Sequence, residues 1–280
     1  MTAAPLLSVL ASLPLLLHRR TRAVPLVLGA LALWQSRAAL WAPKPSQATH
    51  TNCSPLRVVS SNVLYKNRTP RLAAEALMST NPDVIVLVEV SLAVSLHISK
   101  QRYPFELVFS RTDSRGRGYD LRVLSRLPLE HYDDTEAGER FFPLIRVSLN
   151  NAHFALVPVH TSAPHKVSDK QYWRSELHGL ATSLSSVTGP LVVCGDFNAS
   201  LAHRPMARLT KTARLSSVLA RHGRALRGTW GPRGLVALLP IDHVLVSHDV
   251  VSSGISVMRL PGSDHRTLVA DLVIPQALTD

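Results

Sequence analysis

The sequence predicts an α/β sandwich in which stacked β-sheets are flanked by helices. After Pro55, short runs rich in Val, Ile and Leu alternate with a few amphipathic stretches of helical length. Strands this numerous, with few helices between them, bury their apolar faces by stacking as sheets beneath covering helices. No internal repeat or low-complexity tract interrupts this pattern.

The expected elements follow the apolar runs of the chain in order. Each strand is a short β-rich run, and strands are expected at residues 57–63, 83–89, 106–109, 121–125, 144–149, 153–159, 191–195, 242–246, 255–259 and 268–274. Each helix is an amphipathic stretch, and helices are expected at residues 71–79, 92–100, 168–187 and 204–222.

The first 42 residues are expected to form a membrane anchor or a signal segment. Residues 2–17 carry no charge, a basic group follows at 18–22, and residues 23–42 are apolar apart from Arg37. A spanning helix needs roughly 20 apolar residues, so a helical hairpin or a single span at 23–42 fits, giving one or two apolar helices. A signal peptide and a buried helix of a soluble protein are the other interpretations.

The basic group at 18–22 predicts how the rest of the chain is oriented. Basic residues beside a span stay in the cytoplasm, which would leave the chain after Trp41 on the far side of the membrane. Residues 43–55 are polar, contain three prolines and are expected to be a linker. Residues 56–280 are long enough for one large domain. We therefore expect a cell-membrane protein whose large domain, residues 56–280, is extracytoplasmic.

Charge and cysteine content narrow the range of partners. The formal net charge is +12, and outside the five basic residues of the first 44 positions there are 26 basic residues against 19 acidic ones. Such a balance favours a polyanionic or phosphorylated partner, or an anionic membrane surface. Two cysteines, Cys53 and Cys194, cannot form a disulfide framework, and no Cys/His cluster has zinc spacing.

Side chains that bind metals or phosphates stand where several apolar runs begin or end. Burying such groups costs free energy unless a cation or a hydrogen-bond donor compensates them. If the strands share a sheet edge, these side chains converge on one site. They are Asn62, Glu89, His160, Asp196, Asn198, Asp242, Asp264 and His265.

In these segments the chain resembles the endonuclease/exonuclease/phosphatase superfamily. The resemblance covers about residues 57–274, with motifs in family order: VVSSNVLYKN, DVIVLVEV, GYDLRVLSRLPL, VPVHTSAP, VVCGDFNAS, GTW, PIDHVLVS and GSDHRTL. The GDFN tetrapeptide alone is moderately specific, whereas its combination with IDHV and SDH is highly specific. The resemblance implies two stacked, mainly antiparallel β-sheets flanked by helices, a four-layer α/β sandwich, and a divalent-metal-dependent phosphoesterase.

Three residues are expected to hold the cation, Mg²⁺ or Mn²⁺. Glu89 is a hard carboxylate of the kind that these cations prefer. Asn62 would assist with its side-chain oxygen, and Asp264 would complete the shell. These roles follow from donor chemistry and agree with what the resemblance implies.

The other residues are expected to carry catalysis. Asp196 would orient or deprotonate the attacking water, and Asn198 would donate to a phosphoryl oxygen as negative charge builds. His160 would contact the scissile phosphate or protonate the leaving group. His265, oriented by Asp242, is a second acid/base candidate. The sequence leaves open whether Asp196 or His265 takes the proton of the water.

Basic residues accumulate in two stretches that bear on the substrate. No acid lies between Asp196 and Asp242, where the chain contains Arg204, Arg208, Lys211, Arg214, Arg221, Arg224, Arg227 and Arg233. A second cluster consists of Arg111, Arg115 and Arg117. Beside the site these residues would attract a polyanion; otherwise they form a solvated helix face. The sequence does not distinguish DNA, RNA, a phospholipid head group or a sugar phosphate.

The expected function is hydrolysis of phosphodiester or phosphomonoester bonds by metal-assisted in-line attack of water, carried out by a monomer. One alternative is an intracellular DNA-repair endonuclease, against which the apolar N-terminus argues. Another is a non-catalytic relic that binds phosphorylated ligands. A relic would be expected to have lost Glu89, Asp196 or His265, and this chain has kept all three.

Overall fold

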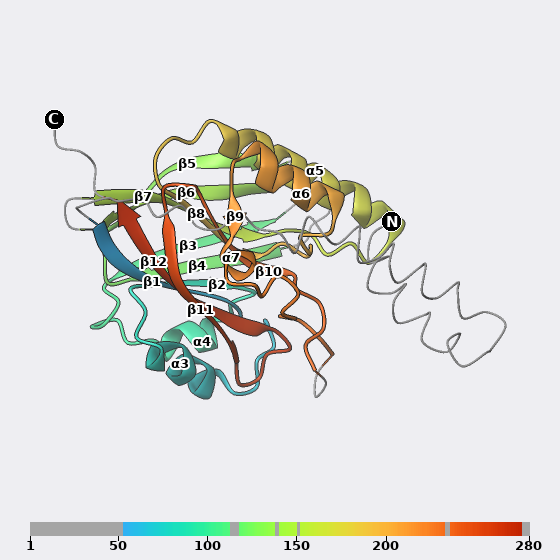
Figure 1. Ribbon diagram of the computed structural model, residues 1–280. Coiled ribbons are helices and arrows are strands. Elements are labelled where there is room, and N and C mark those ends of the chain that lie inside the picture. Colours follow the sequence, from blue (N-terminus) through green and yellow to red (C-terminus); the bar gives the residue numbers. More distant parts are fainter. Residues whose placement is uncertain (1–52, 113–117, 138–139, 150–151, 233–235, 276–280) are drawn as a thin grey trace, which may run out of the picture.

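Two mixed six-stranded β-sheets lie face to face, with helices on their outer sides (Figure 1). The computed structural model describes residues 53–112, 118–137, 140–149, 152–232 and 236–275. The longer helices are α3 (Pro70–Ser79) and α5 (Val167–Ser185), and the shorter ones are α4 (Leu92–Leu96), α6 (Arg204–Thr212) and α7 (Val218–Arg221). The predicted α/β sandwich is therefore confirmed for the described part of the chain.

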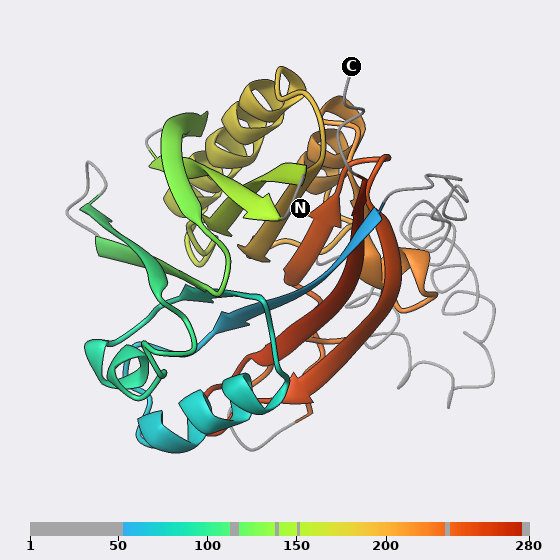
Figure 2. The ribbon, with the colours of Figure 1, turned by 90° about the vertical axis from the view of Figure 1, so that its left-hand side faces the viewer.

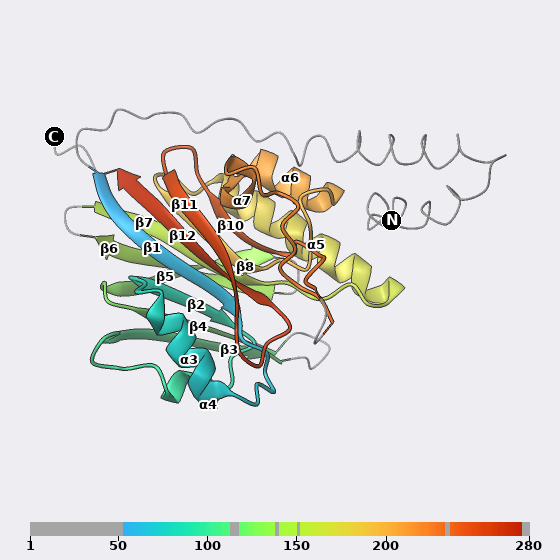
Figure 3. The same cartoon turned by 60° about the horizontal axis from the view of Figure 1, so that its bottom comes forward.

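The first sheet has the strand order β11-β12-β1-β2-β4-β3. Its strands are β1 (Cys53–Asn62), β2 (Val84–Val88), β3 (Phe105–Thr112), β4 (Gly118–Ser125), β11 (Val251–Arg259) and β12 (Arg266–Pro275). Strands β1 and β2 run parallel, and the other neighbouring pairs run antiparallel. Figure 2 shows β1 beside β12, so the first and last strands of the described chain meet in the middle of this sheet, and Figure 3 shows the strand order.

The second sheet has the order β5-β6-β7-β8-β10-β9. Its strands are β5 (Leu129–Ala137), β6 (Arg140–Leu149), β7 (Ala152–His160), β8 (Leu191–Asp196), β9 (Ser216–Ser217) and β10 (Asp242–Val246). Strands β7 and β8 run parallel, and the remaining pairs run antiparallel. Each sheet is therefore mixed, although most of its pairs are antiparallel.

Side chains alternate between the two faces of each strand, and this produces three apolar clusters. One lies between the two sheets, and one lies under the helices on the outer face of each sheet. In β2, Val84 and Val86 pack between the sheets, whereas Ile85 and Leu87 face helix α3 and its residue Leu77. This follows from the two-residue period of a strand that is buried on both sides. A third cluster joins the outer face of the second sheet to α5 and α6. The cluster between the sheets holds them at a fixed separation. The strand ends of one sheet therefore lie beside the strand ends of the other.

Strands β5 and β9 were not predicted, and β9 falls inside the helix predicted at 204–222. Strand β5 was missed because it lies at a sheet edge and has no apolar run, with residues 130–133 exposed. The helix predicted at 204–222 is divided into α6 and α7. It breaks at Arg214, whose φ is 52°, and the Leu215 N–H donates to the Thr210 carbonyl over 2.8 Å. This is the bonding of a Schellman helix end, which the basic composition of the segment did not reveal.

The predicted anchor at 1–42 and most of the predicted linker at 43–55 lie outside the described residues. Strand β1 already begins at Cys53, so residues 53–55 are paired with β12 instead of forming linker. Within the described ranges, no helix is both long and apolar enough to cross a membrane. Cys53 is exposed and Cys194 is buried, and the two do not form a disulfide with each other.

Candidate active site

Three site residues occupy adjacent positions on neighbouring strands of the second sheet. In the parallel pair β7 and β8, His160 lies opposite Asp196, and in the antiparallel pair β8 and β10, Asp196 lies opposite Asp242. Residues directly opposite in a sheet project to the same face with their Cβ atoms about 5 Å apart. The register therefore gathers an imidazole and two carboxylates at one edge of this sheet.

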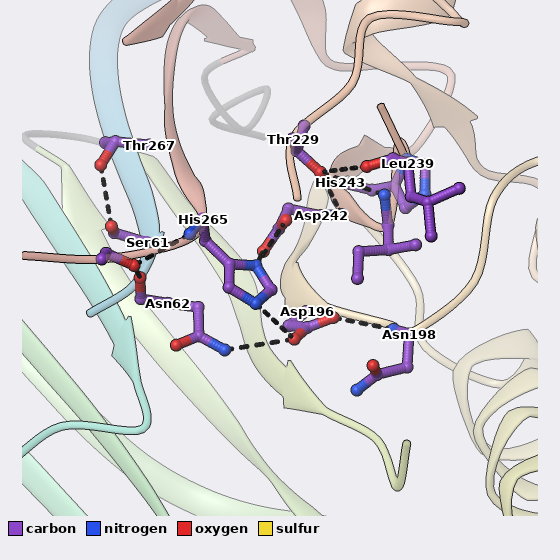
Figure 4. Close-up of polar contacts among 12 residues, drawn as sticks. Ser61, Asn62, Asp196, Asn198, Thr229, Leu239, Asp242, His243, His265 and Thr267 are labelled. Carbon is purple, nitrogen blue, oxygen red and sulfur yellow. Dashed lines mark hydrogen bonds and ion pairs between the residues drawn. The ribbon is translucent and has the colours of Figure 1, made fainter. Parts of the chain in front are cut away.

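The first sheet contributes Asn62 and Glu89 to the same place. Asn62 ends β1 and pairs with Val88, the residue before Glu89. The Asn62 Nδ2 atom donates to Glu89 Oε1 over 2.8 Å. It also donates to Asp196 Oδ2 over 3.2 Å (Figure 4). The His160 Nε2 atom lies 3.6 Å from Glu89 Oε1. One amide thus links the two sheets across the site.

His265 lies between two buried carboxylates. Its Nδ1 atom is 2.9 Å from Asp242 Oδ2, and its Nε2 atom is 3.8 Å from Asp196 Oδ2 (Figure 4). Asp242 is itself held by Thr229, whose Oγ1 accepts hydrogen bonds from the backbone N–H groups of Ile241 and Asp242. The result is a buried chain of three ionisable groups, Asp242, His265 and Asp196, that ends at Asn62 and Glu89.

Local backbone strain positions the carboxylates. Gly195 has a φ of 144°, and a Cβ atom there would lie 1.9 Å from the Val159 carbonyl oxygen, so only glycine fits before Asp196. Glu89 and Asn198 have φ values of 50° and 47°, which are costly for side chains with a Cβ and are typical of functional sites. Asn198 therefore lies beyond the end of β8, in a left-handed backbone conformation instead of an extended one.

Asn198 holds the neighbouring loop in this structure. Its backbone N–H donates to Asp196 Oδ1 over 2.8 Å, and its Nδ2 atom donates to the Thr161 carbonyl over 3.0 Å. The amide that was expected to reach a phosphoryl oxygen thus binds the segment after His160. Its remaining N–H is the one left to donate to substrate.

A buried ion pair that the sequence interpretation missed supports His160. Arg140 Nε lies 3.2 Å from Glu176 Oε1, and Arg140 Nη1 donates to the His160 carbonyl over 2.6 Å. Ser162 donates to Glu176 from both its N–H and its hydroxyl. Glu176 lies between Trp173 and Leu177 on the buried side of α5, and an acid on an apolar helix face was the available signal.

The ionisable groups have displaced pKa values because they are buried together. Burial, followed by the charge of Asp242, raises the pKa of Asp196 to about 7. Burial lowers the pKa of His265, but Asp242 and Asp196 outweigh this effect and raise the pKa to about 10. Burial lowers the pKa of His160 to about 4, since the opposing effect of Glu89 is smaller. At neutral pH, His265 is therefore a cation and His160 is neutral.

The basic stretch after Asp196 has several structural roles. Arg221 donates to the Val250 and Ser247 carbonyls over 2.6 and 3.3 Å, and Arg224 donates to the Ile255 carbonyl over 2.8 Å. These hydrogen bonds tie the segment at the end of α7 to the β10–β11 connection and to β11, and both side chains keep their positive charge. Arg204, Arg208 and Lys211 are exposed on α6. The side chains of Arg111, Arg115, Arg117 and Arg233 lie outside the described ones.

Comparison with known proteins decides the family. The profile of the Endonuclease/Exonuclease/phosphatase family matches residues 59–265, which is most of the chain. The chain belongs to this family. It is an enzyme of the phosphoesterase type, a metal-dependent hydrolase acting on phosphoric ester bonds. Among curated proteins, none matches the chain significantly.

Solved structures share the fold at low sequence identity. D. rerio TDP2 complexed with single strand DNA product is 17% identical, with a TM-score of 0.62 over 78% of this chain and 99% of that one. The human Nocturnin catalytic domain with bound sulfate anion is 18% identical, with a TM-score of 0.60 over 79% and 96%. The 3' phosphatase NExo from Neisseria, bound to product DNA hairpin, is 17% identical, with a TM-score of 0.54 over 77% and 98%.

The residues present fit the divalent cation that this family implies. Ligand atoms of Glu89, His160 and Asp196 lie within 4.8 Å of one another, and so do those of Asp196, Asp242 and His265. Asp264 belongs to neither group, but its Oδ1 atom is buried without a hydrogen-bond partner. Several carboxylates this close together, one with an unused oxygen, are ligands of the kind that a divalent cation prefers.

Asn62 is the one expected metal ligand whose orientation is unfavourable. Its Oδ1 atom accepts the Leu64 N–H over 3.0 Å, while its Nδ2 atom faces Glu89 and Asp196. The amide would have to turn over to offer its oxygen to a cation. Glu89 and the orphaned oxygen of Asp264 are the stronger candidates.

Proposed function

We propose that this chain hydrolyses phosphodiester bonds by in-line attack of a water molecule that Asp196 orients and deprotonates. The proposal rests on one observation above all, the buried contact of Asp196 with a protonated His265 that Asp242 holds in place. Because a histidine with a pKa of about 10 keeps its proton near neutrality, Asp196, with a pKa of about 7, is the better proton acceptor. The sequence left open whether Asp196 or His265 takes the proton of the water, and these pKa values favour Asp196.

The other side chains bind and stabilise charge in this scheme. His265, as a cation, stabilises the charge that develops on the phosphoryl oxygens, and neutral His160 contacts the phosphate instead of protonating the leaving group. Glu89 and Asp264, with Asn62 assisting, would hold Mg²⁺ or Mn²⁺. When bound, such an ion supplies Lewis-acid polarisation of the phosphate and steadies the leaving oxygen.

A nucleic acid is the substrate class that the comparisons favour. The D. rerio TDP2 structure contains a single strand DNA product, and the Neisseria 3' phosphatase contains a product DNA hairpin. The basic balance of this chain is compatible with such a polyanion. A phospholipid or sugar phosphodiester is the competing substrate class.

The first test is metal-dependent hydrolysis of bis-p-nitrophenyl phosphate by the purified full chain. We expect turnover with Mg²⁺ or Mn²⁺ and a loss of at least about 100-fold on adding EDTA, since the ion contributes several kcal/mol of transition-state stabilisation. Re-addition of metal should restore the rate. Turnover that is unchanged by EDTA would contradict the proposal. Plasmid DNA, RNA, sphingomyelin and inositol phosphates under the same metal then rank the substrate classes.

We also propose that the catalytic domain is extracytoplasmic and tethered by residues 1–42. The support is the sequence alone, an apolar segment with its basic group at 18–22. Alkaline phosphatase fused after Asp280 is expected to be active, because this reporter matures only outside the cytoplasm, and the fusion should sediment with membranes. A soluble fusion with an inactive reporter would contradict the proposal.

A further inference from the structure

A cleft beside His265 is lined by two arginines that the proposed mechanism does not use. Its walls include Arg259, Ser263, Asp264, His265 and Arg266, which form the end of the β11–β12 hairpin and the turn between the two strands. The cleft thus shares Asp264 and His265 with the catalytic site. We call it the arginine cleft.

The strand register places both arginines on the hairpin face that packs toward the second sheet, and there Arg259 is exposed and Arg266 is partly exposed. Arg259 and Arg266 are directly opposite each other in the hairpin. Counting back along the same face by twos leads from Arg259 to Val257 and Ile255, and counting forward from Arg266 leads to Leu268, all of which pack between the sheets. The apolar residues on this face of the hairpin are therefore followed by Arg259 and Arg266 at the end that lies next to the active site.

A third arginine approaches the pair from the segment before β10. The Arg266 N–H donates to the Thr229 carbonyl over 2.6 Å, which brings residues 227–229 alongside the start of β12. Arg227 stands two residues before Thr229 in the same segment, so a third basic residue lies near this end of the hairpin.

These charges are not neutralised by the part of the chain that the structure describes. Within the described ranges, Arg227, Arg259 and Arg266 form no ion pair. Like charges directly opposite in an antiparallel pair destabilise it, and carboxylates commonly relieve such a pair. Here the nearby carboxylate is Asp264, a candidate metal ligand. The unrelieved repulsion indicates a site that an external anion completes.

The wall of the cleft is rigid. Gly262 has a φ of 77° and fits so closely that a Cβ atom would lie 2.1 Å from Asn67 Oδ1. Asn67 Nδ2 donates to the Pro261 carbonyl over 2.9 Å, and Ser263 Oγ donates to the Asn62 carbonyl over 2.8 Å. The turn is thereby fixed to the end of β1. An anion bound there would stand at a constant distance from the catalytic residues.

We propose that the arginine cleft binds a second phosphate group of the substrate, beside the phosphate that is hydrolysed. This inference rests on the proposed function, because the cleft shares Asp264 and His265 with the catalytic site. Arginine suits the role, since its planar fork binds phosphate oxygens in pairs. The phosphate could belong to the next nucleotide of a strand or to a phosphorylated head group, and both sources offer the same chemistry.

The test compares substrates that differ by one phosphate, using the purified full chain. One pair is thymidylyl-thymidine with and without a terminal phosphate, and the other is glycerophosphoinositol with and without a ring phosphate. We expect the wild type to prefer the doubly phosphorylated member of one pair, which identifies the source. Arg259→Gln and Arg266→Gln should raise KM for that member by roughly ten- to a hundredfold, the loss expected for a charge-assisted hydrogen bond. Hydrolysis of bis-p-nitrophenyl phosphate should stay unchanged.

A matched variant and a binding measurement make the result specific. Arg208→Gln removes the same charge from the exposed side of α6 and should keep the wild-type preference. In EDTA, inorganic phosphate should raise the Tm of the wild type and of Arg208→Gln, but not of the Arg259→Gln/Arg266→Gln double variant. Absence of substrate preference in both pairs, or an equal loss in Arg208→Gln, would overturn the inference while leaving hydrolysis of bis-p-nitrophenyl phosphate intact. If that hydrolysis fails, the proposed function is wrong, and the Tm measurement still decides whether the cleft binds phosphate.

Discussion

Replacing Asp196 with Asn is expected to lower kcat by about 10³- to 10⁴-fold while leaving the fold intact. The amide keeps the shape of the side chain and can still accept the Asn198 N–H, but it cannot take a proton from water. General-base catalysis contributes about 10² to 10⁴, and the change also removes negative charge beside His265. Steady-state rates on bis-p-nitrophenyl phosphate at saturating Mg²⁺ measure the loss.

The pH dependence of stability in the metal-free protein separates the catalytic effect of this substitution from its effect on folding. The pKa of Asp196 is raised from 3.8 to about 7, chiefly by burial. A carboxyl whose folded pKa is raised binds its proton more tightly when folded, so its ionisation increasingly destabilises the fold as the pH rises from 3.8 to about 7. In EDTA, the Tm of the wild type relative to that of the Asn variant should therefore fall as the pH rises from 3.8 to about 7.

Asp133→Asn provides the matched control for this prediction. Asp133 is exposed on the edge strand β5, far along the sheet order from β8. The control should keep the wild-type kcat. An Asp196→Asn enzyme with more than about a tenth of the wild-type kcat would rule out the role of general base, which is worth at least about 10².

The second large effect is expected for Glu89→Gln, as a loss of metal affinity. The substituted side chain can still accept the hydrogen bond from Asn62 Nδ2, but a neutral amide oxygen is a weaker ligand for a hard cation than a carboxylate. At fixed millimolar Mg²⁺ we expect kcat/KM to fall by about 100-fold or more, since the ion contributes several kcal/mol. Excess Mn²⁺ should recover part of the rate.

A metal titration checks the origin of this loss. The concentration of Mg²⁺ or Mn²⁺ at half-maximal rate should rise in Glu89→Gln and stay constant in Glu130→Gln. Glu130 is an exposed residue of β5 whose ion pair with Arg146 lies on the surface. A Glu89→Gln enzyme with an unchanged titration midpoint would show that Glu89 does not bind the cation.

The sequence allowed prediction of those parts of the fold that depend on local pattern. Runs such as VIVLV are long enough in apolar residues to predict a buried strand, and α3 and α5 follow from helical spacing. Strand β5 and the break at Arg214 were missed because an edge strand needs no apolar run and a helix end is set by backbone hydrogen bonds. Local pattern therefore determined the layers but not all of their edges.

The sequence alone also determined which residues stand at strand ends, and with them the chemistry of the candidate site. Only the tertiary structure decided how these residues meet. The register of β8 with β10 sets Asp196 against Asp242. Burial there raises the pKa of Asp196, while the charges of Asp242 and Asp196 raise the pKa of His265 and keep it protonated. Arg259 and Arg266 likewise face each other only because of the register of the β11–β12 hairpin. The pKa values of these groups and the repulsion between the arginines depend on distances between side chains. Packing of the folded chain fixes those distances, and they cannot be read from the spacing of residues in the sequence.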